Sequence, residues 1–241
     1  MSMRFDIISI FPKIFDSYFS ESIIQRARKK KLVHVFIHDL RAFSRNTHKK
    51  VDDRPYGGGP GMVLTVDALM RAISSVLGKN RRRAGKIKKA AKIVFFSAGG
   101  TQFNQKMASA WAKKYRQIIL VAGHYEGIDE RVKKIFSKKT VRARYAGVRI
   151  ETGDISIGPY VLTGGELPAM VALDAVIRHI PGVLGKETSL EENRYGVGVP
   201  AYTRPEVFTW QGEKYSVPHI LLSGNHKKID EWRARYGKGG N

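Results

Sequence analysis

The sequence predicts an α/β protein whose sheet is mostly parallel, and two patterns support this fold class. Apolar runs of strand length alternate with segments of helical periodicity, in the order strand, helix, strand, loop, helix, strand, helix, strand. Three of these runs are followed directly by glycine-bearing segments, at residues 97–100, 123–131 and 158–168. Because open α/β sheets bind ligands at the carboxyl ends of their strands, these segments predict a ligand crevice.

The first strand is expected at residues 5–10 and the second at residues 32–40, with a helix between them that Pro12 opens. Alternation in the second strand turns its Val and Ile side chains inward. His34 and His38 then share the exposed face, and we interpret them as surface histidines, with metal binding as the weaker alternative. The apolar face of the helix is formed by Ile14, Phe15, Tyr18, Phe19 and Ile23.

A long loop follows at residues 41–61. It contains Val51-Asp-Asp-Arg-Pro-Tyr-Gly-Gly-Gly-Pro-Gly-Met62, in which prolines flank a run of three glycines. Loops of this length in a compact domain are usually functional or disordered, and the glycines suit a backbone that passes close to another group. The elements expected next are a helix capped by Thr65, a basic solvated loop at 79–92, a strand at 92–96, a helix capped by Asn104 and a strand at 118–121.

The stretch from Gly153 to Pro168 is the centre of the predicted crevice. It holds the end of a buried strand, two glycine turns and the first turn of a helix that stops before Pro181. A strand end, a glycine elbow and a helix start bring several backbone N–H and C=O groups around one point, which suits a ligand read by main chain. An ordinary loop that uses glycine for tight turning is the alternative interpretation.

The chain is expected to form two domains. The main α/β domain spans residues 1–184, a polar linker spans residues 185–200, and a small, shortened, α-rich C-terminal domain spans residues 201–241. Trp210 and Trp232 supply large apolar side chains to the small domain.

Charge is the clearest feature of the composition. The 241 residues include 43 Lys and Arg against 21 Asp and Glu, a formal net charge of +22, which indicates a polyanionic partner such as nucleic acid. There is no cysteine, so disulfides, cysteine zinc sites and thiol nucleophiles are excluded. No leader-like segment and no stretch of 18 apolar residues is present, so we expect a cytoplasmic protein without a membrane partner.

Taken together, the motifs resemble those of the bacterial tRNA (guanine-N1)-methyltransferases of the SPOUT class. Each motif alone is weak, but they occur in the order of that family and cover most of the chain. The matching pieces are residues 51–62, Gly123-His-Tyr-Glu-Gly-Ile-Asp-Glu-Arg131, Ser156-Ile-Gly158, Tyr160-Val-Leu162, Gly164-Gly-Glu-Leu-Pro-Ala-Met170, Ile180-Pro-Gly-Val-Leu-Gly185, Tyr202-Thr-Arg-Pro-Glu206 and Leu221-Leu-Ser-Gly-Asn-His226.

This resemblance implies a deep trefoil knot in the sheet domain, S-adenosyl-L-methionine (SAM) bound in that knot, and a homodimer whose interface forms the active site. It implies tRNA as the substrate, methylated at the guanine immediately 3′ of the anticodon. By motif match, the SAM site consists of Phe95, Phe96, Ser97, Ala98, Gly123, Tyr125, Gly127, Ile157, Gly158, Tyr160, Leu162, Gly164, Gly165 and Pro168. Core packing is the alternative role for the apolar members of this set.

Guanine N1 carries a proton at neutral pH, so its methylation needs a base, and negative charge then builds on O6. By motif match, Arg178 stabilises O6; a helix ion pair with Asp174, four residues earlier, is the alternative, and both roles are compatible. Glu126 is the acid most embedded in a matching motif, and it is a candidate to hold substrate or a Mg²⁺ ion.

The position of the family's general base departs from the pattern. The family has an aspartate in the segment after Gly185, and counting places Asn193 there, whose amide is no useful proton acceptor. Three interpretations remain open: Glu191 or Glu192 supplies the base, which we favour; the site is inactivated; or the counting is out of register. An ordinary solvated acidic pair competes with the first.

Two smaller departures are His124, where the family commonly has arginine, and Pro159, where an acid is common. The C-terminal domain is also shorter than usual in the family. Two other functions therefore stay open besides guanine-N1 methylation: a protein that binds tRNA and SAM without chemistry, and a SPOUT methyltransferase for another RNA position.

Overall fold

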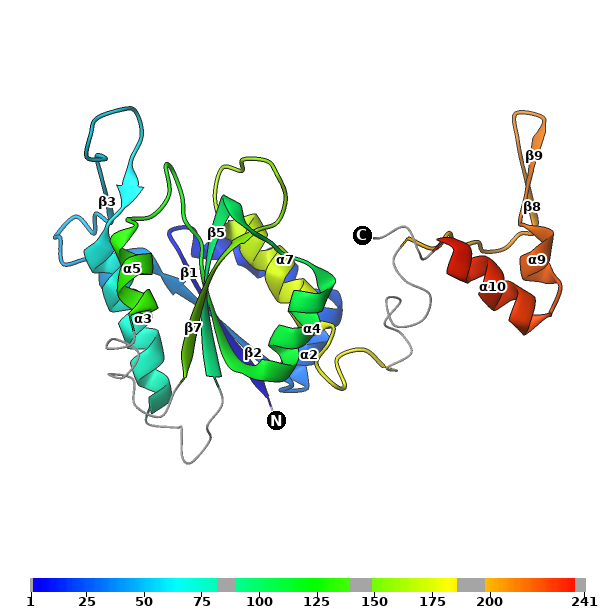
Figure 1. Cartoon of the computed structure of the whole chain (residues 1–241), viewed down its shortest axis with the longest axis horizontal. Coiled ribbons are helices and arrows are strands. Elements are labelled where there is room, and N and C mark those ends of the chain that lie inside the picture. The colour runs from blue at the N-terminus through cyan, green and yellow to red at the C-terminus, as the bar shows by residue number, and fades with distance from the viewer. Residues whose placement is uncertain (1, 82–89, 139–148, 186–197, 237–241) are drawn as a thin grey trace. The chain divides into compact units, whose positions relative to one another are not determined.

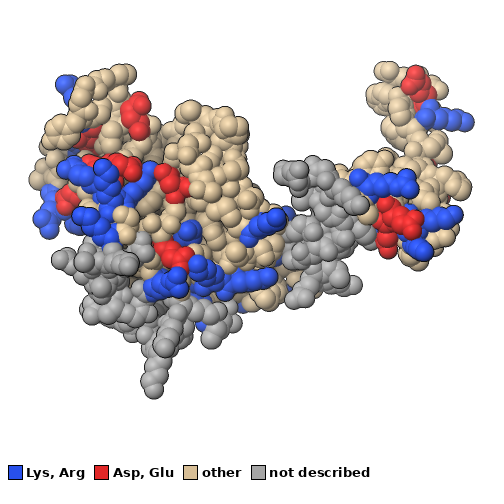
Figure 2. Space-filling view, viewed as in Figure 1, with Lys and Arg blue, Asp and Glu red and all other residues tan. Residues whose placement is uncertain are grey.

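The computed structural model of the chain describes residues 2–81, 90–138, 149–185 and 198–236. The chain forms two compact units, Met1–Val183 and Leu184–Asn241, and most residue contacts fall within one unit or the other. The first unit holds the sheet and the glycine-rich loops, and the second holds a hairpin and two helices. Figure 2 shows Lys and Arg side chains on both units, so each presents cationic groups to solvent.

A five-stranded sheet in the order β2-β1-β6-β5-β7 forms the centre of the first unit, and all four strand pairs are parallel. The predicted α/β class with a mostly parallel sheet is therefore confirmed. The strands of the sheet are β1 (Met3–Ser9), β2 (Val33–Asp39), β5 (Ala90–Gln102), β6 (Tyr115–Val121) and β7 (Ile150–Ser156). The helical segments around it are η1 (Pro12–Phe15), α1 (Asp16–Phe19), α2 (Ser22–Lys29), η2 (Leu40–Phe43), α3 (Val66–Arg81), α4 (Gln105–Lys114), α5 (Arg131–Ser137) and α7 (Glu166–Ile177).

Two layers of helices cover the sheet, so the unit has an α/β/α arrangement (Figure 1). One face packs against η1, α1, α2, α4 and α7, where Phe5, Ile118 and Leu120 meet Phe15 and Leu173 in one buried cluster. The opposite face packs against α3 and α5 in a second buried cluster. Strands buried on both faces explain the continuous apolar runs in the sequence.

The prediction of one continuous helix after Pro12 is wrong. The chain instead forms η1, the single turn α1 and then α2, and Ser22 at the start of α2 has φ of 53°. Ile14 and Tyr18 are about half exposed, while Phe15 and Phe19 are fully buried. Of the five side chains of the predicted apolar face, two therefore reach the core, Ile23 is partly buried, and Ile14 and Tyr18 remain on the surface.

His38 corrects the interpretation of the two histidines. Its Nε2 lies 2.8 Å from Oδ1 of Asp6, a fully buried carboxylate. Arg4 and Gln117 also donate to Asp6, with Arg4 Nε and Gln117 Nε2 each 2.7 Å from Oδ2. His34 is exposed as expected, but His38 belongs to a polar network across β2, β1 and β6 because a buried carboxylate needs donors on several sides.

Strand β5 also differs from the prediction, because it continues through residues 97–100 to Gln102. Its pairing with β7 shifts register between Phe96 and Thr101, so the glycine segment is an excursion within a strand. At Gly100 a Cβ atom would lie 2.7 Å from the Ile155 backbone nitrogen, which leaves room for glycine alone. The basic loop expected at 79–92 is shorter, since α3 reaches Arg81 and β5 starts at Ala90; residues 82–89 lie outside the described part.

The long loop of the first unit contains a short hairpin of β3 (Asp52–Asp53) and β4 (Val63–Leu64). The second unit contains β8 (Val207–Trp210), β9 (Glu213–Ser216), α9 (His219–Leu222) and α10 (His226–Tyr236). Its hairpin was not expected in an α-rich unit. The turn has φ of 49° at Gln211 and 86° at Gly212, both in the left-handed region that tight hairpin turns use.

Candidate functional site

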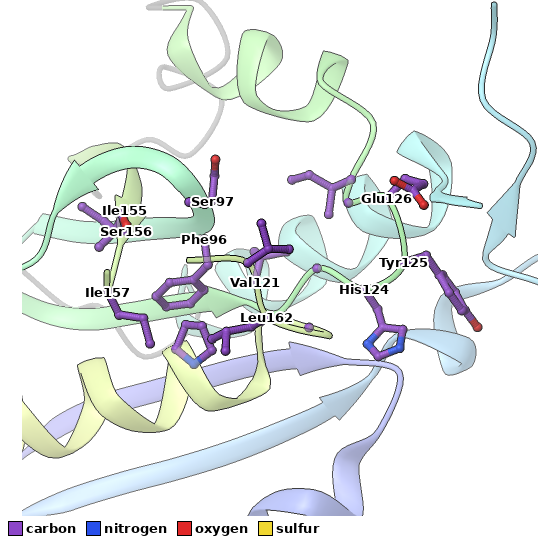
Figure 3. A pocket seen from close by; sticks show the side chains of 18 of the residues that line it. Phe96, Ser97, Val121, His124, Tyr125, Glu126, Ile155, Ser156, Ile157 and Leu162 are labelled. Atoms are coloured by element: carbon purple, nitrogen blue, oxygen red, sulfur yellow. The ribbon is translucent and has the colours of Figure 1, made fainter. Parts of the chain in front are cut away.

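A pocket of about 310 Å³ lies at the carboxyl ends of β6 and β7, against residues 96–98 of β5 and beside the first turn of α7. Three segments that are distant in the sequence meet there, as the crevice prediction expects: residues 96–98, just before Gly99 and Gly100, and the glycine-rich segments 123–128 and 155–165. Figure 3 shows Phe96, Ile157 and Leu162 close together on one side and Glu126 on another. The pocket is therefore apolar at one end and acidic at the other.

Every residue assigned to the SAM site from the sequence lines this pocket except Phe95. Phe95 is buried in the cluster beneath α3 and α5, on the opposite face of the sheet from Phe96. Successive strand residues point to opposite faces, so adjacent phenylalanines cannot both enter one pocket. The lining also includes residues that the sequence reasoning did not assign to the site: Val121, His124, Ile128, Glu130, Lys133, Ile155, Ser156 and Val161.

The segment between β7 and α7 forms one wall and is braced by its own side chains. Ser156 Oγ donates to the Gly158 carbonyl at 2.8 Å, and the Tyr160 hydroxyl donates to the Ile157 carbonyl at 3.1 Å. The Tyr160 ring lies so close to Gly158 that a side chain there would overlap it. The wall consequently presents main chain and the faces of Ile157 and Leu162 to the pocket (Figure 3).

Glycine is required where α7 begins against the end of β6. The Gly165 N–H donates to the Gly123 carbonyl at 2.7 Å, and Gly164 bridges to His124. A Cβ atom at Gly165 would lie 2.8 Å from Ala122 Cα and from Gly123 N, both of which are backbone. The two loops thus approach closer than any side chain permits, and this contact closes the floor of the pocket.

The loop after β6 carries Glu126 into the pocket. Tyr125 and Gly127 have φ of 58° and 111°, so the chain turns sharply around Glu126. The Glu126 N–H donates to the Met62 carbonyl, and Leu64 N–H donates to the Gly127 carbonyl, both at 3.0 Å. These bonds join the loop to the β3–β4 hairpin, and they fix Glu126 between the pocket and the glycine-rich segment that precedes β4.

A buried carboxylate supports the start of α7. Glu166 is 5% exposed and accepts a 2.7 Å hydrogen bond from Ser9 Oγ, which itself accepts from the Phe11 N–H at 2.8 Å. His124 Nδ1 lies 3.7 Å from Glu166 Oε2, too far for a hydrogen bond, and this buried nitrogen has no hydrogen-bond partner among the described residues. Glu166 and Ser9 therefore position the pocket loops without lining the pocket.

Glu130 and Lys133 form a charged rim of the pocket, and Asp154 pairs with Lys133 outside the pocket lining. Lys133 Nζ lies 2.7 Å from Asp154 Oδ2 and 3.2 Å from Glu130 Oε2. Burial opposes the charge on Lys133, but these two ion pairs outweigh it and raise its pKa. A rim lysine cannot be told from a surface lysine in the sequence, which explains why Lys133 was missed.

Arg178 stands apart from the pocket within one chain. It caps the carboxyl end of α7, whereas Gly165 caps the amino end, and a helix of 12 residues is about 18 Å long. Burial raises the pKa of nearby Asp174, and the positive charge of Arg178 partly opposes this shift. Arg178 is thus near enough to influence Asp174 electrostatically, which is compatible with the predicted ion pair, and the pocket-lining residues do not include it. Glu191, Glu192 and Asn193 lie outside the described residues.

In the ranges from 2 to 236 that the structure describes, no three His, Cys, Asp or Glu side chains group as a metal site. Among those ranges, no helix is long and apolar enough to cross a membrane.

Comparison with known proteins gives a consistent result. The family model described as tRNA (Guanine-1)-methyltransferase TrmD matches residues 3–239. A tRNA (guanine-N(1)-)-methyltransferase of Clostridioides difficile is 44% identical over 234 residues, which cover 96% of this chain and 90% of that protein. Proteins of the same name from Dehalococcoides mccartyi and Pelotomaculum thermopropionicum are 42% and 43% identical over 236 residues, covering 97% of this chain and 85% and 84% of theirs.

Proposed function

Because this chain belongs to the tRNA (guanine-1)-methyltransferase family, we propose that it uses SAM to methylate N1 of the guanine immediately 3′ of the anticodon. The family match over residues 3–239 carries the assignment of the chain as a tRNA guanine-N1 methyltransferase. The position of the target guanine, immediately 3′ of the anticodon, is our proposal. We place the activity in the cytoplasm, where tRNA is used in translation.

The lining of the pocket supports SAM as its ligand. Its backbone-lined floor at Gly123 and Gly165 admits a flat ring close to main chain, and Phe96, Ile157 and Leu162 offer apolar surface. Glu126 offers a carboxylate to a cationic ligand at the other end. When bound, SAM supplies an electrophilic methyl group on a sulfonium. Such a group needs orientation more than activation, which suits a rigid main-chain cradle.

The protein's own chemical task is to manage the guanine proton and the charge that follows its removal. We propose that Arg178 donates hydrogen bonds to O6, where negative charge builds once N1 loses its proton. Glu192, with Glu191 as its neighbour, would take that proton, since Asn193 at the expected position has no basic atom. Glu126 would hold the substrate or a Mg²⁺ ion beside the pocket.

Arg178 can take part in catalysis at the pocket if the active site is assembled from two copies of the chain. The end of α7 that carries it is about 18 Å from the end beside the pocket, so Arg178 of one copy would serve the pocket of another. An apolar surface supports this homodimer: Leu167 and Val171 on α7 are about half exposed, as are Ile14 and Tyr18 on the neighbouring η1 and α1. Exposed apolar side chains that gather on one face mark interaction surfaces.

The family resemblance also leads us to propose a deep trefoil knot in the first unit, and a tRNA-binding role for residues 201–241. The close approach of Gly165 to Gly123 supports the first, since the segment before α7 lies directly against the segment after β6. The basic and aromatic residues of the second unit support the second, and the Trp232 ring contacts the rings of both Tyr202 and Tyr236.

The test is transfer of labelled methyl from SAM to an unmodified tRNA transcript with guanine 3′ of the anticodon, beside the adenine version. We expect 1-methylguanosine from the guanine transcript alone. Label in both transcripts would reject this target position. Glu191→Gln with Glu192→Gln should abolish transfer, while Glu187→Gln in the same segment serves as the matched control. No transfer by the unaltered protein, with tRNA and SAM still bound, would favour a binding protein, and gain of activity in Asn193→Asp would then show an inactivated enzyme.

A further inference from the structure

A glycine arm, which we define as residues 54–61, projects from the β3–β4 hairpin (Figure 1). Gly57, Gly58, Gly59 and Gly61 all have φ between 79° and 107°, in the left-handed region. At the first three of these glycines no described atom lies within 4 Å of the place where a Cβ would be. Glycine is therefore needed here for backbone conformation. Within the described residues, no group packs closely against the backbone at Gly57, Gly58 or Gly59.

The base of the arm is joined firmly to the cofactor pocket. Thr65 N–H donates to the buried Val51 carbonyl at 2.8 Å, which closes the hairpin. Met62 and Leu64 exchange three backbone hydrogen bonds of 3.0 Å with residues 126–129 of the pocket loop. Gly61 packs so tightly on the Glu126 side chain that a Cβ would overlap it. The arm consequently has a defined position relative to the pocket wall.

The tip of the arm presents Tyr56, which is 99% exposed. A fully exposed aromatic ring gains nothing from the core, so its presence at a fixed position points to an external contact. Three cationic side chains lie near it: Arg54 is exposed in the arm, Lys50 precedes it, and Arg131 is close enough to interact electrostatically with the Tyr56 hydroxyl. Lys50 and Arg131 also form exposed ion pairs with Asp53 and Asp129. An aromatic ring among cations is the combination that binds single-stranded nucleic acid through stacking and phosphate contacts.

We propose that Tyr56 is a stacking platform for an unpaired base of the tRNA substrate, and that the glycine arm holds this base beside the pocket. The inference rests on the proposed function, since it assigns a substrate-binding role next to the same pocket. Every base has a flat aromatic face, so the contact would position the loop of the tRNA and leave the choice of guanine to groups around N1 and O6.

A second copy of the chain is the competing partner for the arm. The exposed apolar side chains suited to such contact are on α7, η1 and α1, which cover one face of the sheet. The hairpin that carries the arm is joined to the loop before α5, and α5 and α3 cover the other face. The arm is also flanked by charges, whereas the α7 surface is apolar. These observations favour RNA.

Steady-state kinetics with the full chain and an unmodified tRNA transcript test the proposal. We expect Tyr56→Ala and Tyr56→Leu to raise the KM for tRNA by roughly tenfold, the effect of losing one stacked base, with little change in the KM for SAM. Tyr56→Phe, which keeps the ring and loses the hydroxyl, should restore the KM. Tyr160→Phe, whose hydroxyl braces the pocket wall, is the matched control and should act on the KM for SAM. A transcript with 2-aminopurine in the anticodon loop should lose fluorescence on binding the unaltered protein and regain it with Tyr56→Ala.

The outcomes separate the hypotheses. An unchanged KM for tRNA in both Tyr56→Ala and Tyr56→Leu overturns the stacking role. An equal rise in the KM for SAM would show that the arm supports the pocket, and a shift in sedimentation would show that it contacts another copy; either result also overturns the proposal. If the unaltered protein transfers no methyl, the proposed function fails by itself, and the fluorescence signal still reports whether Tyr56 stacks on RNA.

Discussion

Ser9 Oγ donates a 2.7 Å hydrogen bond to Glu166 Oε1, linking the end of β1 to the first residue of α7 across 157 positions of sequence. Both groups are buried, so the bond satisfies a carboxylate that would otherwise be desolvated without a partner. The same carboxylate faces His124, whose loop lines the pocket. One hydrogen bond outside the pocket thus holds the geometry of the two loops inside it.

We expect Ser9→Ala to destabilise the protein by about 1–3 kcal/mol, because it strips a donor from a buried carboxylate. The KM for SAM should rise as well, since α7 and the His124 loop lose their common anchor. Urea unfolding and SAM titration measure the two effects. Ser20→Ala, which removes an exposed hydroxyl bonded only to the Ser17 carbonyl, is the control. Equal behaviour of the two variants would show that the Ser9–Glu166 bond does not support the pocket.

Gly165→Ala should weaken SAM binding by at least tenfold and lower the unfolding free energy by about 1–3 kcal/mol, the usual cost of overpacking. The added methyl would meet backbone atoms 2.8 Å away, which cannot move without separating the two loops. Gly78→Ala provides the contrast, because nothing lies within 4 Å of that position in α3. There the same substitution should stabilise the helix by about 0.5–1 kcal/mol. Calorimetric titration with SAM compares them.

The Asp6 network should make stability depend on pH in the acid range. Burial would raise the pKa of Asp6, but hydrogen bonds from His38, Arg4 and Gln117 outweigh it and hold the pKa below 3.8. The folded form therefore binds this proton less readily than the unfolded form, so the contribution is complete above about pH 5 and is lost as pH falls through the unfolded and then the folded pKa.

Asp6→Asn tests this dependence. It should cost about 3 kcal/mol at pH 7, since Arg4 loses the buried carboxylate with which it forms an ion pair. Urea unfolding between pH 7 and pH 3 should then show a smaller loss of stability in Asp6→Asn than in the unaltered protein. Asp16→Asn, at an exposed position in α1, should leave the pH profile as it was. Parallel profiles for the unaltered protein and Asp6→Asn would contradict the assignment.

Mixed dimers test whether Arg178 serves the pocket of another copy. Arg178→Ala and Glu126→Gln should each be inactive alone. When the two chains are co-expressed, half of the dimers are mixed and each carries one intact site, so about a quarter of the activity should return by the symmetry of a two-fold dimer. If both residues served a pocket in their own chain, no mixture would regain activity. Mixing either variant with itself provides the baseline.

The glycine-rich loops could be predicted to converge because the argument needs only the order of strands and the common edge at which parallel strands end. That rule alone predicts that Gly123, Gly165 and Ile157 lie together at the pocket. His38 was misjudged because its partner Asp6 lies on a neighbouring strand, and pairing across strands is invisible in one strand's alternation. Lys133 was missed for the same reason, since Asp154 and Glu130 draw it to the rim only in the folded unit.

Other local details were out of reach for different reasons. The break before α2 depends on a left-handed Ser22, which helical periodicity does not reveal. The continuation of β5 past Gly100 depends on the backbone of β7 lying 2.7 Å from a missing Cβ. The β8–β9 hairpin had a local signal in Gln211-Gly212, but exposed aromatic residues on both strands gave no pattern of a buried face.

The strand order β2-β1-β6-β5-β7 also bears on how the protein is made. Strand β6 lies between β1 and β5 although it is synthesised after both, so a growing chain that stops short of Tyr115 can form no more than the β1–β2 pair of this sheet. Two-stranded pairs are marginal in water, and the apolar edge of β1 stays open until β6 arrives. The nascent chain therefore exposes that edge until residues 115–121 have been made, so fast elongation would shorten the exposure and chaperones would cover it, and cofactor binding can report that the sheet has closed.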